Sequence, residues 1–252
     1  PGSAGSSWYF LRYIDPHNDQ KLANKKLLEH WLPVDLYVGG PEHTTGHLLY
    51  SRMWNNFLYD EGIVPVKEPF QKLVHPGMIL GANGIKMGKR YPEFIIDPND
   101  VIAKYGADTL RLYEMFMGPL EVSKPWDDNG VAGARKFLDR IWKIYQEKEI
   151  GDFENENLKQ IYHQTVKKVT EDFESLNFNT AISQMMIFIN AVAKENKLPR
   201  QYAEGFIKLL NPICPFITEE LWQNLGHNGT ISYEKWPTFD EKALVKDSFE
   251  VP

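Results

Sequence analysis

The sequence predicts an α/β region followed by an all-α helical bundle. Up to about residue 118, short apolar strand-like segments alternate with helical patterns, as in a doubly wound sheet. From about Asn129 onward, only amphipathic helical patterns follow one another. Residues 118–128 contain glycine, prolines and charged residues between the two patterns, and we expect them to form a linker.

The clearest strand-to-helix step lies at residues 35–60. Residues 35–40 read Asp-Leu-Tyr-Val-Gly-Gly, a short apolar strand that ends in two glycines. A helical pattern over residues 42–60 follows directly, with an apolar stripe formed by Leu48, Leu49, Met53, Phe57 and Leu58. Because ligands bind doubly wound sheets at the carboxyl ends of the strands, residues 39–43 are the expected binding edge.

A glycine-rich hairpin is expected at residues 77–90. A short apolar strand enters the pair Asn83-Gly84, and both residues accept a positive φ at low cost, which favours a tight turn. The exit of the hairpin presents Lys86, Lys89 and Arg90. Concentrated positive charge on a flexible loop suits a triphosphate or a nucleic-acid backbone, although a solvated basic loop would have the same composition.

The remaining helices are predicted from their caps and apolar stripes. Asp-Pro-Asn-Asp at residues 97–100 combines a capping side chain, an early proline and an acid at the positive end of the helix dipole. Farther along, breaks are expected at Gly151, Asn177, Pro199 and Asn211-Pro212. Between the breaks run apolar stripes that contain Phe137, Ile141 and Ile144; Leu158, Ile161/Tyr162, Val166, Val169, Phe173 and Leu176; Ile182, Met185/Met186, Ile189 and Val192/Ala193; and Phe206, Leu209/Leu210 and Ile213.

The composition is that of an ordinary globular protein. Of the 252 residues, 42% are apolar and 25% are charged, which suffices for one large core or two moderate ones. No stretch approaches the ~20 apolar residues of a membrane span, so no membrane partner is expected. The net charge of −6 argues against a nucleic-acid binder unless the cations are clustered. The single cysteine, Cys214, is flanked by apolar residues, which predicts a buried thiol and a cytoplasmic protein.

Several motifs together carry a resemblance to a known family. The run Lys-Met-Gly-Lys-Arg at residues 86–90, the helix start at 97–100 and Tyr-Gly-Ala-Asp-Thr-Leu-Arg at 105–111 are similar to the signature-loop region of class I aminoacyl-tRNA synthetases. The likeness is greatest to the leucyl-tRNA synthetases. Residues 176–182 and 209–222 resemble the anticodon-binding domain of the same family. The family loop usually reads Lys-Met-Ser-Lys-Ser, and here Gly88 and Arg90 depart from it.

The resemblance implies a domain arrangement. Residues 1–125 would be the second part of a Rossmann-type nucleotide-binding catalytic domain, including the signature loop. Residues 126–252 would be a helical anticodon-binding domain that contacts tRNA. Neither the family's His-Ile-Gly-His motif nor its editing insertion is found in this sequence. We therefore expect a fragment that is inactive alone and has the rest of the synthetase polypeptide as a partner.

The resemblance also implies roles for individual residues. In similar enzymes Gly-Gly-x-Glu-His binds the ribose of ATP, which suits a carboxylate that can only accept hydrogen bonds. The predicted ATP-binding residues are Gly39, Gly40, Glu42, Met78, Ile79, Lys86, Lys89 and Arg90. Lys86 and Lys89 are the predicted catalytic residues, because cations there would stabilise the charge that grows on the departing pyrophosphate. The predicted leucine-binding residues are Ser6, Tyr9, His43 and His47.

Other interpretations of the histidine pair and of a basic stripe stay open. The spacing of His43 and His47 also suits a metal pair, but no third ligand lies nearby in the sequence, so no protein-bound metal is expected. ATP would bring its own Mg²⁺. Lys136, Arg140 and Lys143 form a basic stripe that is either a solvated helix face or a contact for the tRNA backbone.

The activity implied by the resemblance is ATP-dependent attachment of leucine to tRNA(Leu) by way of leucyl-adenylate. Selection of leucine would rest on shape, since its side chain offers no hydrogen bonds and one methyl group is worth only ~1–3 kcal/mol. Two alternatives stay open. One is a synthetase for methionine, isoleucine or valine, and the other is a non-catalytic RNA-binding paralogue, which the departures at Gly88 and Arg90 permit.

Overall fold

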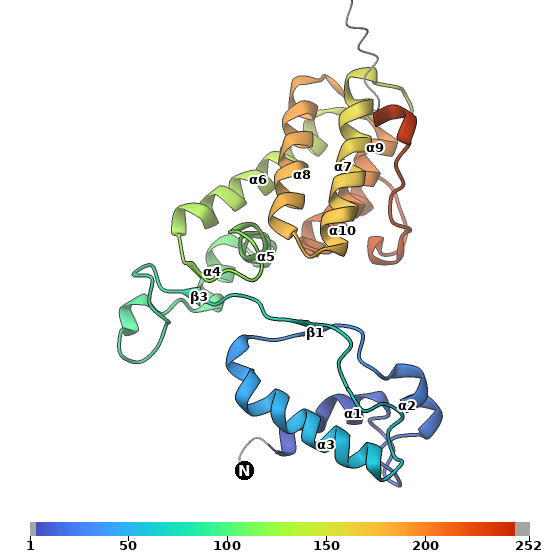
Figure 1. Cartoon of the computed structure of the whole chain (residues 1–252). Coiled ribbons are helices and arrows are strands. Elements are labelled where there is room, and N and C mark those ends of the chain that lie inside the picture. Colours follow the sequence, from blue (N-terminus) through green and yellow to red (C-terminus); the bar gives the residue numbers. More distant parts are fainter. Residues whose placement is uncertain (1–3, 245–252) are drawn as a thin grey trace, which may run out of the picture. The chain divides into compact units, whose positions relative to one another are not determined.

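The computed structural model describes residues 4–244, which form two compact units (Figure 1). The N-terminal unit runs up to Met78 and includes Glu121–Ser123. The C-terminal unit comprises Ile79–Leu120 and the chain from Lys124 onward. The predicted fold class is confirmed, because an α/β portion with small parallel sheets precedes a helical bundle. No helix in residues 4–244 is both long and apolar enough to span a bilayer.

The N-terminal unit is built around one parallel strand pair and the helices that flank it. Its elements are the 3-10 helix η1 (Gly5–Trp8), α1 (Tyr9–Ile14), α2 (Lys25–Trp31), β1 (Tyr37–Val38), the 3-10 helix η2 (Pro41–His43), the π-helix η3 (Thr44–Leu48), α3 (Leu49–Asp60) and β2 (Leu73–Val74). β1 and β2 pair in parallel, which requires a crossover connection, and η2, η3 and α3 supply it. The predicted strand is therefore confirmed. The segment predicted as one helix over residues 42–60 is helical, but it is a 3-10 helix and then a π-helix before it becomes α-helical at Leu49.

The apolar stripe predicted on that helix is wrong for three of its five residues. Leu48 is buried and Leu58 is half-buried, as expected. The other three side chains lie on the solvent face, with exposed fractions of 60% for Leu49, 49% for Met53 and 54% for Phe57. The apolar stripe therefore does not identify the face of α3 that packs against the rest of the N-terminal unit.

The buried face of α3 is polar instead. Ser51 and Asn55 are fully buried, and the side-chain amide of Asn55 donates to the carbonyls of Val66 and Lys67 at 2.9 Å each. A buried carbonyl without a partner costs free energy comparable to a lost hydrogen bond. Satisfying these two carbonyls fits the observed rotation of α3, in which the polar face is turned inward.

The core of the N-terminal unit is small. Its buried members come from the segments before and after β1 and are Phe10, Leu11, Ala23, Leu28, Leu32, Leu48, Val64 and Phe70. Their side chains form one cluster that joins α1, α2, the end of η3 and the segments on either side of β2.

The C-terminal unit contains the larger number of helices. Its elements are β3 (Ile79–Leu80), η4 (Pro92–Phe94), α4 (Pro98–Tyr105), α5 (Ala107–Phe116), β4 (Lys124–Pro125), α6 (Asp128–Glu147), β5 (Glu149–Gly151), α7 (Glu156–Glu174), α8 (Phe178–Lys194), β6 (Lys197–Pro199), α9 (Arg200–Leu210), α10 (Pro215–Asn224), η5 (Ile231–Tyr233) and η6 (Glu241–Leu244). Figure 1 shows α7 and α8 running side by side. β3 pairs in parallel with β4, and β5 with β6.

The core of the C-terminal unit is the one that the apolar stripes predict. Of the residues named above for the four stripes, Ile161, Phe173, Leu176 and Met186 are half-buried and Ala193 is exposed, while the others are buried. The predicted caps are present as well, since Asp97 accepts a hydrogen bond from the N–H of Asn99 at the start of α4. Cys214 is also buried, and this burial raises the pKa of its thiol, as expected for an inert cysteine.

The compact units divide the chain upstream of the predicted domain boundary at residue 125. Residues 79–120 pack with the bundle, because α5 contacts α6 and α8 and because α4 contacts α6. Arg111 of α5 adds two hydrogen bonds to the bundle, at 2.8 Å to the carbonyl of Ile213 and 2.9 Å to that of Pro212. Domain bounds based on sequence relatedness can differ from such packing units, and the bounds 1–125 and 126–252 remain a prediction.

Candidate active site

A cavity of about 580 Å³ lies at the carboxyl ends of β1 and β2 in the N-terminal unit. This is the edge at which ligands bind in α/β folds. The cavity brings together seven residues with predicted roles, namely Ser6, Tyr9, Gly39, Gly40, Glu42, His43 and His47. Its lining is completed by Tyr37, Val38, Gly46, Leu48, Leu73 and His75.

The glycine turn after β1 is tied to the end of β2. The N–H of Gly39 donates to the carbonyl of Val74 at 3.0 Å. Nδ1 of His75 lies 2.7 Å from the carbonyl oxygen of Gly39. Because a carbonyl can only accept, Nδ1 is the donor, and Nε2 of a neutral His75 ring is then an acceptor. The peptide that follows Gly39 is trans, so the N–H of Gly40 points away from the His75 ring.

Glu42 folds its carboxylate back over this turn. A Cβ atom added at Gly40 would lie 2.2 Å from Oε2 of Glu42, a distance that real atoms do not adopt. Glycine at position 40 therefore leaves room for the carboxylate in its present position. The Glu42 side chain is 49% exposed and lies 3.9 Å from Nε2 of His43. A half-exposed carboxylate beside a cavity can accept hydrogen bonds from the hydroxyl groups of a ligand.

Part of the cavity wall is a cluster of aromatic rings joined by hydrogen bonds. The hydroxyl of Tyr37 lies 2.7 Å from that of Tyr9 and 2.5 Å from Nε2 of His47. The His47 ring stacks against both tyrosine rings, with centroid separations of 5.9 Å. Tyr37 in turn stacks on Phe70, at 4.1 Å between centroids. These contacts make a stiff, mostly apolar wall with few free polar groups.

Burial sets the protonation of this wall. Desolvation, and then the nearby His43, hold the pKa of His47 below its usual 6.5, so this ring is neutral at pH 7. Desolvation followed by the hydrogen bond with Tyr9 raises the pKa of Tyr37, which keeps its hydroxyl protonated. The wall is therefore uncharged near neutral pH, which suits an apolar group of a ligand.

The predicted hairpin is present in the C-terminal unit. The N–H of Gly81 donates to the carbonyl of Ile85 at 2.9 Å, Leu80 and Lys86 form an antiparallel bridge, and Gly84 has a φ of 75°. A Cβ atom at Gly88 would meet nothing within 4 Å, so a serine at this position would fit.

The cations of the hairpin are available to a ligand. Lys86, Lys89 and Arg90 are exposed, and none of them forms an ion pair with the other described residues. Arg90 lies 5.4 Å from the centroid of the Tyr91 ring. This loop belongs to the C-terminal unit and the cavity at β1 and β2 to the N-terminal unit.

The last two predicted ATP-binding residues fall where the chain passes from one unit to the other. The N–H of Met78 donates to the hydroxyl of Ser123 at 2.9 Å. Ile79 begins β3 and pairs with Lys124 of β4. Neither residue lines the cavity at β1 and β2.

The predicted tRNA-binding residues lie on the surface of α6. Lys136, Arg140 and Lys143 are all exposed. Arg140 donates a hydrogen bond to the side-chain carbonyl of Asn190 on α8, and Lys143 lies 3.8 Å from Glu147. Surface ion pairs of this kind contribute little to stability, so these side chains can be redirected to another partner at low cost.

Of the six lining residues without a predicted role, Tyr37 and His75 are the two whose side chains make hydrogen bonds at the cavity. Tyr37 lies inside the predicted strand and carries no motif of its own, whereas His75 follows a strand that was not predicted. The signal for that strand was the apolar pair at residues 73–74, followed by His75 and a proline-glycine turn. Two parallel strands present their carboxyl ends at one edge of the sheet, so the residue after each strand was a candidate for the lining of a ligand site there.

The expected absence of a metal site stays a prediction. In the described part of the chain, no three side chains of His, Cys, Asp or Glu gather in a way that could hold a metal ion. His43 and His47 are adjacent, with ring centroids 6.2 Å apart. Nε2 of His47 is already occupied by the hydroxyl of Tyr37.

Comparisons with known families match both parts of the chain. Residues 16–122 match the family described as tRNA synthetases class I (I, L, M and V). Residues 155–251 match the anticodon-binding domain of tRNA ligase.

Two solved structures illustrate what the fold is similar to. The chain is 32% identical to the LeuRS of Agrobacterium radiobacter K84 agnB2, solved in a ternary complex with tRNA and LeuAMS, with a TM-score of 0.82. That match covers 95% of this chain and 34% of the LeuRS chain. Methionyl-tRNA synthetase of Mycobacterium tuberculosis, bound by methionyl-adenylate, shares the fold at 14% identity, with a TM-score of 0.62. This second match covers 81% of this chain and 46% of the other, so the chain spans less than half of either relative.

Proposed function

Because this chain belongs to the class I aminoacyl-tRNA synthetases, we propose that it is part of a leucine–tRNA ligase, which uses ATP to attach leucine to tRNA(Leu). The observation that carries the proposal is the cavity at β1 and β2, which collects all the residues predicted for leucine and three of those predicted for ATP. Leucine is favoured over methionine because identity to the LeuRS is 32% across almost the whole chain, against 14% to the methionyl enzyme.

Two groups of lining residues suit the two parts of a leucyl-adenylate. The uncharged wall of Tyr9, Tyr37 and His47 would surround the isobutyl side chain, which can bury apolar area but makes no hydrogen bonds. Glu42 and the Gly39–Gly40 turn would bind the ribose, with the carboxylate accepting from its hydroxyl groups. Leucine selection would therefore depend on the shape of the aromatic wall.

The hairpin cations would act on the phosphates. When the leucine carboxylate attacks the α-phosphate of ATP, pyrophosphate leaves with growing negative charge. Lys86, Lys89 and Arg90 are exposed and unpaired among the described residues, so they could bind these oxygens, with Mg²⁺ carried by the nucleotide. Met78 and Ile79 would serve as backbone contacts for the adenine. On α6, Lys136, Arg140 and Lys143 would contact the tRNA backbone.

The activity would require more than this chain. The chain corresponds to about a third of the LeuRS to which it is similar. We therefore propose that it works together with the rest of a synthetase polypeptide in the cytoplasm and is inactive as an isolated fragment.

Leucine-dependent ATP–pyrophosphate exchange tests the proposal. The full-length synthetase should exchange with leucine, and much more slowly with isoleucine, valine or methionine, while the 252-residue chain alone should show only background exchange. Preference for another amino acid would assign a different synthetase. Absence of exchange together with retained tRNA binding would identify a non-catalytic RNA-binding paralogue, which the departures at Gly88 and Arg90 permit.

A further inference from the structure

His75 lines the cavity at β1 and β2 without a part in the proposed function. The two strands pair in parallel register, so the residues that follow them, Gly39 and His75, lie side by side. The proline at position 76 disfavours helical backbone at His75, which keeps this residue in line with β2. The strand pair and the proline together fix where the His75 side chain begins.

One hydrogen bond orients the imidazole ring of His75. Nδ1 lies 2.7 Å from the carbonyl oxygen of Gly39 and donates to it, so Nε2 of the neutral ring carries a free lone pair. Among the described residues, no group donates a hydrogen bond to Nε2. The half-buried ring therefore presents an oriented and unused acceptor in the lining of the cavity.

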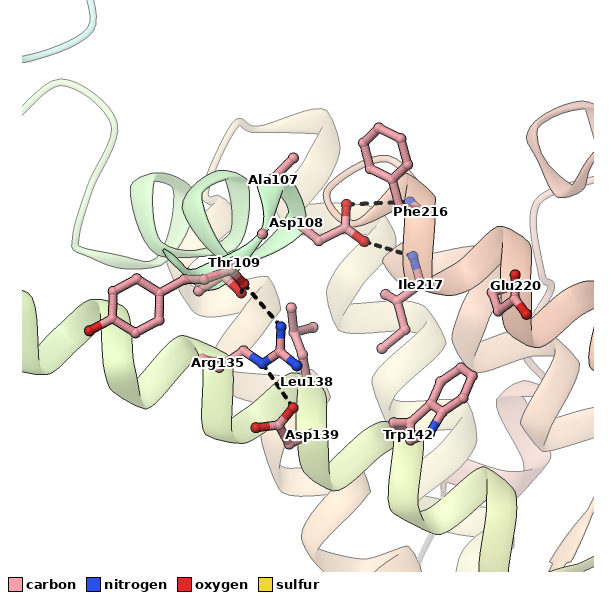
Figure 2. A pocket seen from close by; sticks show the side chains of 12 residues that line it. Ala107, Asp108, Thr109, Arg135, Leu138, Asp139, Trp142, Phe216, Ile217 and Glu220 are labelled. Atoms are coloured by element: carbon pink, nitrogen blue, oxygen red, sulfur yellow. Dashed lines mark hydrogen bonds and ion pairs between the residues drawn. The ribbon is translucent and has the colours of Figure 1, made fainter. Parts of the chain in front are cut away.

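A polar group in a second cavity serves the fold instead. This cavity, of about 490 Å³, lies in the C-terminal unit between the α4–α5 junction, α6 and α10 (Figure 2). The carboxylate of Asp108 accepts hydrogen bonds there from the N–H groups of Phe216 and Ile217, at 3.3 Å and 2.7 Å (Figure 2). These bonds join α5 to α10 and occupy the carboxylate. Nε2 of His75 has no such task in the described part of the chain and is available to a ligand.

The ligand group that binds Nε2 has to be a hydrogen-bond donor. A leucyl-adenylate offers three kinds of donor, which are the ribose hydroxyl groups, the adenine amino group and the leucine ammonium group. His75 is bonded to Gly39, and the Glu42 carboxylate folds over Gly40. Both acceptors are thus tied to one two-residue turn. Two neighbouring acceptors match the two neighbouring hydroxyl groups of ribose, whereas each amino or ammonium group is a single site on the ligand.

We propose that His75 is a second ribose-binding residue, in which Nε2 accepts a hydrogen bond from one hydroxyl group of the ATP ribose while Glu42 accepts from the other. This inference deepens the proposed function and rests on it, because it takes ATP as a ligand of this cavity. The consequence is selection of a nucleotide that carries both hydroxyl groups. An analogue without one of them leaves an acceptor of the site unpaired and is bound less well.

Leucine-dependent ATP–pyrophosphate exchange by the full-length synthetase tests the contact. Values of kcat and KM are measured for ATP, 2′-deoxy-ATP, 3′-deoxy-ATP and purine riboside triphosphate, with the wild type, His75→Asn and Glu42→Gln. An asparagine amide can still donate to the carbonyl of Gly39, but it places no acceptor at the position of Nε2. The matched control is His17→Asn, because His17 is an exposed histidine of the same unit that does not line the cavity. Melting temperatures verify that each variant folds.

The expected result isolates one hydrogen bond. His75→Asn should raise the KM for ATP about three- to tenfold and leave kcat nearly unchanged, which is the effect of losing one neutral hydrogen bond in binding. It should leave the KM for one of the two deoxy analogues within about twofold of wild type, because that analogue has no hydroxyl group for Nε2. Glu42→Gln should be insensitive to the other deoxy analogue in the same way. His17→Asn should match the wild type with all four nucleotides.

Several outcomes would overturn the ribose contact. Equal effects of His75→Asn on ATP and on both deoxy analogues would exclude it. A raised KM for leucine would assign Nε2 to the ammonium group, and lost discrimination against purine riboside triphosphate, which lacks the amino group, would assign it to adenine. A lowered kcat with every nucleotide would show that His75 only supports the Gly39 turn. These outcomes leave the synthetase assignment intact, whereas a wild-type enzyme without leucine-dependent exchange would overturn that assignment and the His75 contact together.

Discussion

Replacing Gly40 by alanine should impair nucleotide binding without unfolding the protein. The new Cβ atom would lie 2.2 Å from Oε2 of Glu42 and 2.6 Å from Oε1, so the carboxylate has to move. Because the Glu42 side chain is 49% exposed, it can swing into solvent at little cost. The backbone at Gly40 has a φ of −60°, which alanine adopts readily. We therefore expect a change in unfolding free energy below ~1 kcal/mol.

The loss of binding follows from the displaced carboxylate. A hydrogen bond to a charged group contributes roughly 1.5–3 kcal/mol, and 1.4 kcal/mol corresponds to a factor of ten. If Glu42 accepts from the ribose, Gly40→Ala should raise the KM for ATP by about 10- to 100-fold. Glu42→Gln should have a similar effect. The double variant should be little worse than either single one, because both changes remove the same contact.

A glycine outside the cavity supplies the control. A Cβ atom at Gly133 of α6 would meet nothing within 4 Å, so Gly133→Ala should leave the KM for ATP within about threefold of wild type. The assay is leucine-dependent ATP–pyrophosphate exchange by the full-length synthetase, with thermal unfolding measured on the same samples. An unchanged KM for ATP in Gly40→Ala, or additive effects in the double variant, would refute the role given to Glu42.

Further outcomes are expected for the hairpin, the bundle and His47. Lys89→Ala in the full-length enzyme should slow single-turnover leucyl-adenylate formation at least ~10²-fold with leucine affinity nearly unchanged, because its charge acts on the departing pyrophosphate; an unchanged rate would contradict this. Gly205→Ala should destabilise the bundle by ~1–3 kcal/mol in thermal unfolding, since its Cβ would lie 1.9 Å from the hydroxyl of Tyr162. Gly133→Ala, on the open surface of α6, should instead stabilise by about 0.5–1 kcal/mol. Burial holds the pKa of His47 in the folded protein below 6.5, so the unfolded chain binds more protons than the folded one. The contribution of His47 to the free energy of unfolding is therefore complete above about pH 6.5 and should be lost on acidification. His47→Gln should flatten that pH dependence, and an unaltered profile would show that the ring is solvated.

The bundle could be predicted from the sequence with little loss. Buried residues such as Ile141, Val166 and Ile189 recur with the helical period, and a period of 3.6 residues assigns the buried face whatever the partner helix. Gly84 takes a positive φ for a reason that is equally local, since the sterics of a tight turn act on its own backbone. The motif residues near Gly39 and His47 could also be placed together, because a strand followed by a glycine turn and a helix brings them to one edge.

The rotation of α3 could not be predicted in this way. Its apolar stripe has the helical period, yet Leu49 and Phe57 face solvent while Asn55 is buried. The deciding contacts join Asn55 to two carbonyls of a loop eleven and twelve residues away. Apolar periodicity carries no information on which buried carbonyls need a hydrogen-bond donor.

Sequence by itself determined those features of this protein whose causes lie within a few residues, such as turns, caps and apolar periods. Tertiary structure alone decided which residues complete each cavity. His75 reaches the cavity at β1 and β2 because β2 pairs with β1, and Trp142 and Glu220 line one cavity of the C-terminal unit because α6 and α10 pack together. The physical reason is that hydrogen-bond satisfaction and close packing act between segments distant in the chain, where no local pattern specifies the partner.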